Sequence, residues 1–430
     1  MRVFAKRALL PQGWTSDVTL EIDAAGTIAA ISMDRAGIFT ADERLTAIAP
    51  GMANLHSHAF QRAMAGRGER PSRGGGDGDD FWTWREAMYA LATTLDPDAI
   101  HRIALRTYRA MLRAGYTAVA EFQYIHRDPS GAWYADRCAT SEALVAAARE
   151  AGIAICLLPA LYAQGDPSGA ALGERQKRFA TTVDDVLAIA VEIRARHAGN
   201  DDVTVGICAH SLRAVTLRQF GDLLAESPPL APVHLHIAEQ EREVAEVFAA
   251  HGARPIELLL RSFDVDERWC LVHATQATDA ELRDIAATGA IVGLCPTTEA
   301  NLGDGIFPLE TFLRYGGRFG IGSDSNVSIS AVEELRLLEY GQRLLHKRRI
   351  VARVGDASGA EALYAASASD GAHACGFASG ALAIGMRADL IELPVAGDGP
   401  DASDDDRMDR YVFADLDGRP ARTMVRGRWR

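Results

Sequence analysis

The stretch GMANLHSH at residues 51–58 predicts a buried strand that ends in two histidines, and it is the first of eight runs that together predict the fold. Its apolar start is typical of a strand covered on both faces in a parallel sheet. Side chains at positions i and i+2 of a strand point to the same side, so His56 and His58 share one face. Seven more apolar runs of strand length follow along the chain: TAVAEFQY (117–124), IAICLLPALY (153–162), VTVGICAHS (203–211), PVHLHIAEQ (232–240), WCLVHATQ (269–276), AIVGLCPTTE (290–299) and RFGIGSDSN (318–326).

Longer segments of helical period separate these runs. Examples are TSEALVAAAREAG (140–152), TLRQFGDLLAES (216–227) and TDAELRDIAATG (278–289). Each opens with threonine in a capping position, and two of them end in glycine. Strands that alternate with helices in this way predict an α/β protein, a (β/α)8 TIM barrel over residues 51–379.

The two ends of the chain have short alternating runs instead, which are typical of antiparallel strands. We therefore predict a small β-sandwich domain built from residues 1–50 plus 380–430, with the barrel inserted between them. The runs are RVFAKRALL (2–10), DVTLEID (17–23), GTIAAIS (26–32), ADLIELP (388–394), RYVFADL (410–416) and RTMVRGRWR (422–430). The glycine- and aspartate-rich stretch at 68–80 predicts an exposed loop, and its glycines make it the best candidate for a mobile cover over the site.

Composition excludes several classes of protein. The 430 residues carry a net charge of −13, so we expect no nucleic-acid partner. No run approaches the roughly 20 apolar residues of a membrane helix, and the first residues do not resemble a signal peptide. The six cysteines form no CxxC pair, and we expect small buried side chains in a reducing cytoplasm.

Polar side chains collect at the carboxyl ends of the predicted strands, where TIM barrels hold their active sites. His56 and His58 end the first strand, His236 the fifth, and Asp324 the eighth. Three imidazoles and a carboxylate suit a borderline cation, so we predict one divalent metal ion, with Zn²⁺ as the expected species. Such an ion makes bound water acidic enough to yield hydroxide near neutral pH. No lysine lies on a predicted barrel strand to bridge a second metal, although iron, manganese or nickel would accept the same ligands.

Three residues at the strand ends are suited to moving protons. Glu239 follows His236 by three positions and is predicted to carry a proton between the activated water and a substrate nitrogen. His273, at the end of the sixth strand, is predicted to polarise or protonate the reacting group. Asp324 is predicted to take the proton of the water. His234 shares a strand with His236, and we expect it to be a packed interior residue.

This order of HxH, HxxE, His and Asp resembles the amidohydrolase superfamily, in its single-zinc deaminase branch. GMANLHSH and SGALAIGMRADLIEL (379–393) are similar to the superfamily's boundaries between β domain and barrel, and the resemblance covers essentially the whole chain. Six further motifs together resemble the family of formimidoylglutamate deiminases: HSHAFQRAMAG (56–66), FWTWREAMY (81–89), FQYIHRD (122–128), HSLRAV (210–215), HIAEQ (236–240) and CPTTEANLGDGIFP (295–308).

The resemblance implies a cytoplasmic enzyme of histidine degradation. Such an enzyme converts N-formimidoyl-L-glutamate and water to N-formyl-L-glutamate and ammonia. It also implies a homodimer and substrate roles for Gln61, Arg85, Tyr124, His210 and Arg213. A small dicarboxylate substrate suits two arginines, because guanidinium groups bind carboxylates in bidentate pairs.

Two other functions remain open from the sequence. The chain could be another single-metal deaminase, or a chlorohydrolase, acting on a heterocycle such as guanine. Arg85 and Arg213 argue against that function, because a neutral ring needs no pair of carboxylate ligands. The chain could also be a non-catalytic metal-binding scaffold, but a scaffold has no use for Glu239 and His273 as proton carriers.

Overall fold

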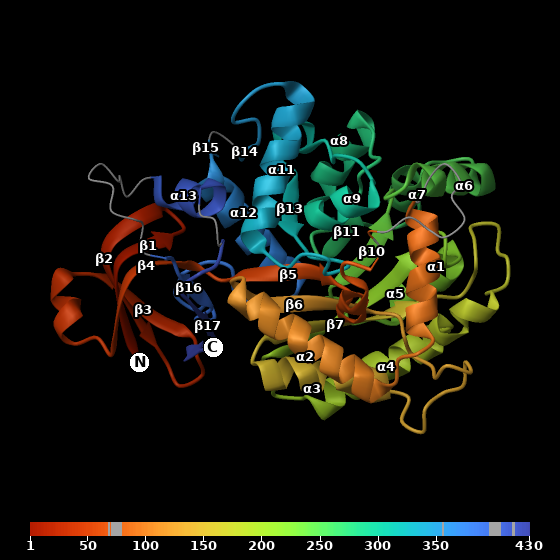
Figure 1. Cartoon of the computed structure of the whole chain (residues 1–430), viewed down its shortest axis with the longest axis horizontal. Coiled ribbons are helices and arrows are strands. Elements are labelled where there is room, and N and C mark those ends of the chain that lie inside the picture. The colour runs from red at the N-terminus through yellow and green to blue at the C-terminus, as the bar shows by residue number, and fades with distance from the viewer. Residues whose placement is uncertain (68, 70–79, 355–356, 395–405, 415–417) are drawn as a thin grey trace.

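The computed structural model describes the chain apart from residues 68, 70–79, 355–356, 395–405 and 415–417. A parallel barrel occupies one side of the molecule and a sheet formed by both ends of the chain occupies the other (Figure 1). The predicted cover at 68–80 lies almost entirely outside the described residues.

One parallel sheet forms the barrel, and its strand order is β13-β12-β11-β10-β9-β7-β6-β5, with β8 paired to β7. Every one of the eight predicted runs contains a strand. The fourth run is divided at Gly206, where a Cβ atom would lie 2.6 Å from the Pro232 carbonyl oxygen. The strands are β5 (Met52–Ser57), β6 (Tyr116–Gln123), β7 (Ala154–Leu161), β8 (Val203–Val205), β9 (Ile207–Ser211), β10 (Val233–Ile237), β11 (Trp269–His273), β12 (Ile291–Leu294) and β13 (Arg318–Ile321).

The seam between β5 and the segment after β13 closes the barrel. The Asp324 amide donates to the His56 carbonyl at 2.9 Å, and the His58 amide donates to the Asp324 carbonyl at 2.9 Å. The close approach requires glycine at position 322, because a Cβ there would lie 2.8 Å from the His56 oxygen. The first and last strand ends of the barrel therefore meet, and the predicted (β/α)8 fold is confirmed.

Helices cover the outside of the barrel. The predicted caps form at Thr216 and Thr278, whose hydroxyls accept from backbone amides at 3.1 and 3.3 Å. Thr140 does not cap its helix, because that helix begins one residue earlier, at Ala139. The helices are α1 (Phe81–Ala92), α2 (Pro97–Arg113), α3 (Ala139–Ala151), α4 (Val183–Arg196), α5 (Leu217–Glu226), α6 (Glu241–His251), α7 (Pro255–Ser262), α8 (Asp279–Thr288), α9 (Pro296–Leu302), α10 (Leu309–Arg314), α11 (Ala331–His346), α12 (Ala360–Ala374) and α13 (Arg407–Phe413), with 3-10 turns η1 (Arg35–Phe39), η2 (Ala59–Met64) and η3 (Glu174–Phe179).

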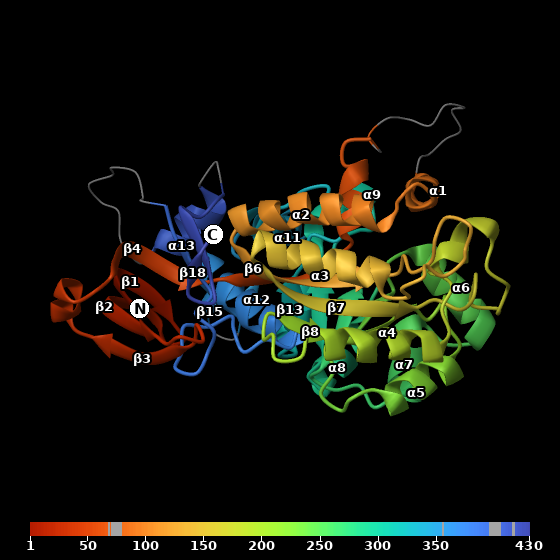
Figure 2. The same ribbon diagram turned by 90° about the horizontal axis from the view of Figure 1, so that it is seen from below.

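Both ends of the chain contribute to a seven-stranded sheet of order β18-β17-β16-β4-β1-β2-β3. Figure 2 shows the blue C-terminal segments beside the red N-terminal strands. The sheet has its own core, which includes Val3, Leu20, Ile48, Leu390 and Met424. Its strands are β1 (Arg2–Leu10), β2 (Gly13–Ile22), β3 (Ile28–Met33), β4 (Glu43–Pro50), β16 (Leu390–Glu392), β17 (Arg422–Val425) and β18 (Arg428–Trp429); β14 (Arg353–Val354) and β15 (Ala357–Ser358) pair separately.

One predicted terminal strand is a helix. RYVFADL was expected to be extended, but Arg407–Phe413 forms α13 and packs in the barrel core. The buried residues Met408, Tyr411 and Val412 have the i, i+3, i+4 spacing of a helix. No helix in the described part of the chain is both long enough and apolar enough to cross a bilayer.

Candidate active site

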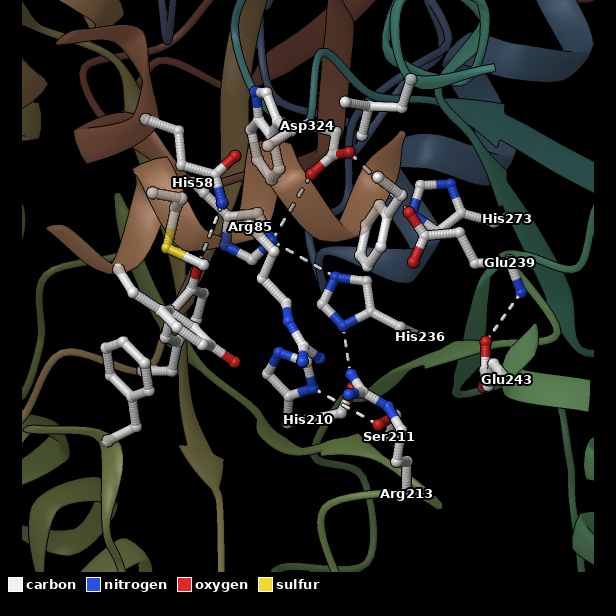
Figure 3. A pocket seen from close by; sticks show the side chains of 18 of the residues that line it. His58, Arg85, His210, Ser211, Arg213, His236, Glu239, Glu243, His273 and Asp324 are labelled. Atoms are coloured by element: carbon white, nitrogen blue, oxygen red, sulfur yellow. Dashed lines mark hydrogen bonds and ion pairs between the residues drawn. The ribbon is translucent and has the colours of Figure 1, made fainter. Parts of the chain in front are cut away.

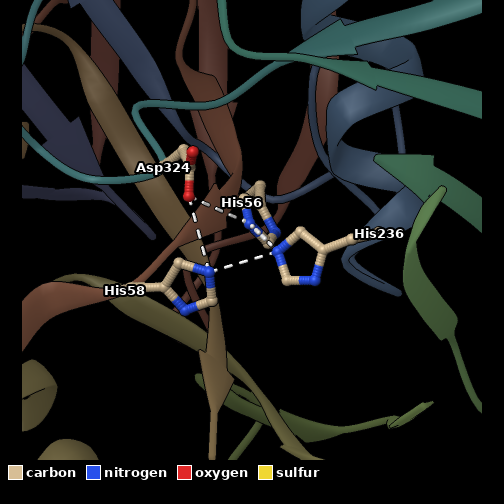
Figure 4. Close-up of side chains that lie close together, drawn as sticks. All are labelled: His56, His58, His236 and Asp324. Carbon is tan, nitrogen blue, oxygen red and sulfur yellow. Dashed lines mark hydrogen bonds and ion pairs between the residues drawn. The ribbon is translucent and has the colours of Figure 1, made fainter. Parts of the chain in front are cut away.

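Three imidazoles and one carboxylate converge at the mouth of the barrel (Figure 4). The His236 Nε2 atom lies 3.1 Å from His56 Nε2 and 3.2 Å from His58 Nε2. Asp324 Oδ1 lies 3.3 Å from His56 Nε2 and 3.4 Å from His58 Nε2. The structure thus brings together all four predicted metal ligands, which we call the metal cluster.

The hydrogen bonds of the cluster fix which ring atoms face its centre. His58 Nδ1 donates to the Phe122 carbonyl at 2.9 Å, and His236 Nδ1 donates to the His210 carbonyl at 2.8 Å. Burial lowers the pKa of His56 and His58 well below the usual range and that of His236 to about 4, so the rings are neutral. The Nε2 atoms of His58 and His236 therefore present lone pairs, not protons, to each other. A set of converging lone pairs and a carboxylate fits a divalent cation that accepts nitrogen and oxygen ligands.

Strained backbone surrounds the metal cluster. Asp324 has a φ of 41° and His273 a φ of 70°, in the left-handed region that side chains disfavour. Asn326, with a φ of 58°, helps to hold this geometry. Its buried Nδ2 donates to the carbonyls of Asp324 and His58 at 2.9 and 3.1 Å. The seam of the barrel thus orients Asp324 through both backbone and side-chain contacts.

The three predicted proton carriers lie together on one side of the cluster. His273 Nε2 lies 3.7 Å from Glu239 Oε1 and 3.9 Å from Asp324 Oδ2. Burial raises the pKa of Glu239 to about 7. Burial alone would lower the pKa of His273, but the carboxylates of Glu239, Glu299 and Asp324 outweigh it and raise the pKa to about 10. Glu239 can therefore hold or release a proton near neutral pH, while His273 stays a proton donor.

Two buried glutamates that the sequence analysis did not single out position these groups. Glu299 Oε1, in the first turn of α9, lies 3.2 Å from His273 Nδ1 and accepts from the Cys295 amide at 2.9 Å. Glu243 Oε2, on α6, accepts from the Glu239 amide at 3.0 Å. The signal for Glu299 was its place in a helix directly after a barrel strand. No local signal marked Glu243.

All five predicted substrate residues line one pocket with the proton carriers and with His58 and His236 of the metal cluster (Figure 3). The pocket has a volume of about 630 Å³, part of which is open to solvent. Gln61 Nε2 donates to the Tyr124 hydroxyl at 2.9 Å, and the His210 ring lies 5.5 Å from the Tyr124 ring. These three residues form a polar group next to the metal cluster.

Arg85 and Arg213 form a second polar group, which we call the arginine clamp. Arg213 is 7% exposed, and Figure 3 shows both side chains reaching toward His210. The buried Nε and Nη1 atoms of Arg85 have no hydrogen-bond partner in the described chain. Burial lowers the pKa of Arg85, and the charge of Arg213 acts in the same direction. A half-buried cation with two buried, unused donors calls for an anion from outside the protein.

Aromatic side chains complete the pocket and were not predicted individually. They come from α1, from the end of β7 and from η3, and they are Phe81, Trp84, Tyr89, Tyr162 and Phe179. The motif FWTWREAMY signalled an aromatic cluster, but the sequence does not show which rings face inward. His234 lies outside the pocket, where its Nε2 is 2.8 Å from the Ala374 carbonyl, as expected for a packed interior residue. All six cysteines are buried and unpaired.

Comparisons with known proteins agree with this geometry. A model of the amidohydrolase family matches residues 47–430, and a model described as the formimidoylglutamate deiminase HutF N-terminal domain matches residues 1–47. The chain is 48% identical to formimidoylglutamate deiminase of Pseudomonas aeruginosa, over 99% of this chain and 94% of that protein. It is 28% identical to a 5-methylthioadenosine/S-adenosylhomocysteine deaminase of Halobacterium salinarum, over 91% and 83%. The crystal structure of an amidohydrolase from Brucella melitensis superposes with a TM-score of 0.92 at 42% identity, covering 100% of this chain and 94% of that one.

Proposed function

The chain belongs to the amidohydrolase family, and from that membership and the geometry of its pocket we propose that it is a hydrolase of linear C–N bonds. The reaction we assign is the conversion of N-formimidoyl-L-glutamate and water to N-formyl-L-glutamate and ammonia, a step of histidine degradation. The 48% identity to a formimidoylglutamate deiminase over nearly the full length supports this assignment.

One observation carries the proposal from the side of the structure. His58, His236 and Asp324 of the metal cluster share a single pocket with the arginine clamp. Two buried donors of Arg85 have no partner among the described residues. A substrate that joins a hydrolysable carbon to carboxylates matches both groups at once.

We assign the two carboxylates of the substrate to different parts of the wall. Arg85 and Arg213 both approach the ring of Trp82, at 4.3 and 5.5 Å, so both can bind the side-chain carboxylate. Gln61, Tyr124 and His210 lie nearer the metal cluster and offer donors to the α-carboxylate. Binding at two points fixes the formimidoyl carbon at the reacting position.

The metal cluster would hold one divalent ion, for which Zn²⁺ is our assignment because three imidazoles and a carboxylate are its usual ligands. When bound, such an ion supplies a nucleophile by making water acidic near neutral pH. Iron, manganese and nickel accept the same ligand set, and an analysis of the bound metal distinguishes them from Zn²⁺.

The residues of the chain carry the protons of the reaction. Asp324 Oδ2, on the side of His273, accepts a proton as water adds to the formimidoyl carbon. Glu239, with its pKa near 7, delivers a proton to the nitrogen that leaves as ammonia. His273, held by Glu299, donates a hydrogen bond to the tetrahedral intermediate. The hydroxyl group of the intermediate then returns a proton to Glu239 as the bond from the formimidoyl carbon to the terminal nitrogen breaks. Ammonia leaves and the formyl group remains on glutamate.

The alternatives make different demands on the pocket. A heterocycle such as guanine would leave the arginine clamp without a partner, at a cost in buried charge. A metal-binding scaffold would not need a glutamate with a pKa of about 7 beside a protonated histidine.

Ammonia release from N-formimidoyl-L-glutamate by the metal-loaded protein tests the proposal. Guanine and N-formimidoylglycine serve as controls that lack the side-chain carboxylate. Release from the glutamate derivative alone is the expected result. Equal release from all three compounds, or release from guanine alone, would overturn the substrate assignment.

We also propose a homodimer in the cytoplasm, as the family resemblance implies. Support for a second copy comes from exposed apolar side chains on α11 and beside it: Ile306, Tyr340, Leu344, Leu345 and Ile350. Light scattering after size exclusion should give twice the 46.2 kDa mass of one chain. A mass of one chain at micromolar concentration would contradict the dimer.

A further inference from the structure

Three guanidinium groups approach the ring of a single tryptophan beside the pocket. The Cζ atoms of Arg242, Arg85 and Arg213 lie 4.1, 4.3 and 5.5 Å from the centre of the Trp82 ring. Trp82 and Arg85 belong to α1, Arg242 belongs to α6, and Arg213 follows β9. The ring therefore joins three elements that are far apart in the sequence.

The way Trp82 holds Arg85 differs from the way this chain holds two buried arginines outside the pocket, Arg178 and Arg387. Arg178 donates to the carbonyls of Arg127 and Leu95 at 2.8 and 2.7 Å. Arg387 donates to Asp389 at 3.0 Å and to Asp202 at 2.9 Å. The N–H donors of those two side chains form hydrogen bonds within the protein. Arg85, by contrast, has buried Nε and Nη1 atoms without a partner in the described chain.

An aromatic ring suits an arginine that must bind an anion from solution. The face of the ring attracts the cation electrostatically and uses none of its N–H donors. A carboxylate in the same place would hold the guanidinium more firmly but would occupy the donors that the substrate needs. The ring also holds two like charges of the clamp near each other without neutralising them.

We propose that Trp82 is a positioning residue that sets the specificity for the side-chain carboxylate of the substrate by holding the arginine clamp open for it. Arg242 contacts the same ring from α6 and ties it to the helix that also carries Glu243. This inference rests on the proposed function, since it concerns how that substrate is recognised. Trp82 lies behind the wall of the pocket and acts through Arg85 and Arg213.

Kinetics with two matched substrates test the proposal. The variant Trp82→Leu removes the indole face and leaves Arg85 only the more distant Tyr89 ring, at 5.4 Å, whereas Trp82→Phe keeps an aromatic face at position 82. N-formimidoyl-L-glutamate carries the side-chain carboxylate, whereas N-formimidoyl-L-glutamine replaces it with a neutral amide of the same shape. For Trp82→Leu we expect KM for the glutamate derivative to rise roughly 3- to 30-fold with kcat nearly unchanged. The kinetics of the glutamine derivative should stay as in the wild type, and Trp82→Phe should recover most of the loss.

The chain supplies a matched control in Trp133. Its ring lies 4.3 Å from Arg127 Cζ and 4.8 Å from Arg137 Cζ, so it has the same chemistry outside the pocket. Trp133→Leu should leave KM for both substrates unchanged. An equal rise of KM for both substrates in Trp82→Leu, a fall of kcat alone, or no effect would each overturn the specificity role.

Binding of glutarate to the metal-loaded protein separates this inference from the proposed function. If wild type releases no ammonia, the substrate assignment fails, but the clamp can still be tested by calorimetry with this plain dianion. The Kd for glutarate should rise roughly 3- to 30-fold in Trp82→Leu and little in Trp82→Phe. An unchanged Kd, or no glutarate binding by wild type, would show that Trp82 does not organise a carboxylate site. If Trp82→Leu does not fold, Trp82→Tyr and Arg242→Gln replace it, with smaller rises of Kd expected.

Discussion

The metal cluster and the arginine clamp occupy the same pocket but are held by different means. Two of the three histidines of the cluster donate Nδ1 to backbone carbonyls, and Asp324 is joined to the first strand by two backbone hydrogen bonds. Among the described residues, the guanidinium groups of the clamp make no such hydrogen bonds. Arg85 lies on a helix, Arg213 in a loop, and both approach the side chain of Trp82.

We infer that the two halves of the pocket have different roles, since the metal cluster is held rigidly and the arginine clamp is not. Backbone at the strand ends of a barrel fixes atoms within a fraction of an ångström, which the reacting centre requires. Side chains held by an aromatic ring can adjust to an anion as it arrives. Changes in the cluster should therefore affect chemistry for every substrate, whereas changes in the clamp should affect binding of one class of substrate.

The largest effect is expected from His58→Ala, which removes one ligand of the metal cluster. Loss of a metal that supplies several kcal/mol to the transition state should lower kcat/KM by at least about 10³-fold. The loss should be the same for the glutamate and glutamine derivatives. Metal content by mass spectrometry and ammonia release measure both effects, and a chelator followed by added Zn²⁺ should abolish and restore wild-type activity. Near-normal turnover by a metal-free variant would contradict the role of the metal cluster in the reaction.

The next effect is expected from Glu239→Gln, which keeps the shape of the side chain but removes the proton it carries. We expect kcat to fall by roughly 10²- to 10⁴-fold for both derivatives, because general acid–base catalysis contributes that much. Metal content should stay at the wild-type level, since Glu239 is not one of the four ligands. A variant with normal kcat and bound metal would exclude the proton-carrying role.

The sequence predicts the metal cluster well because its motifs are local. In HxH and HxxE the spacing alone places two side chains at one strand end, and a barrel brings its strand ends together. Glu239, His273 and Asp324 follow from the same rule. Gln61, Arg85, Tyr124, His210 and Arg213 came from a resemblance, and they line the pocket; their roles stay predictions until they are tested.

What the sequence could not predict depends on contacts between distant elements. Trp82 and Glu243 act on residues of other elements or across a turn, and no local pattern distinguishes them from surface side chains. RYVFADL fitted a strand because the run omits Met408, which completes the helical spacing of α13. Gly206 divided a predicted strand because of a close approach to Pro232, which only the folded chain reveals. The domain boundaries at 50/51 and 379/380 also stay predictions.

A smaller effect is expected in the clamp, from Arg85→Gln. Loss of a charge-assisted pair with the side-chain carboxylate should raise KM for N-formimidoyl-L-glutamate roughly 10- to 100-fold. The value of kcat should change far less, and the glutamine derivative should be hydrolysed as by the wild type. Arg85→Lys should not restore KM, because an ammonium group lacks the planar fork and stacks less well on an indole. Steady-state kinetics with both derivatives measure this difference. An equal rise of KM for both derivatives would mean that Arg85 does not recognise the side-chain carboxylate specifically.

The smallest effect concerns the base of the metal cluster, where Glu121 is buried on β6. Its Oε1 accepts from the Ala59 amide at 2.7 Å, next to His58, and burial raises its pKa from 4.5 to about 8. Between pH 4.5 and 8 the folded chain therefore keeps a proton on Glu121 that the unfolded chain has already lost. The stability that this proton contributes is complete below pH 4.5 and is lost as the pH rises through 8.

Glu121→Gln has no proton to lose, so its melting temperature should fall less than that of the wild type as the pH rises across this range. We expect the difference between the two proteins to change by about 1–4 °C, measured by calorimetry on metal-loaded protein at matched ionic strength. Arg85→Gln is the control, because the clamp carries a charge that does not titrate in this range. If the melting temperatures of wild type and Glu121→Gln changed in parallel with pH, protonation of Glu121 would make no measurable contribution to the stability of the fold. Diverging curves would mean that the framework which fixes the metal ligands, and not the site of carboxylate binding, contributes a proton-linked part of the stability of the fold.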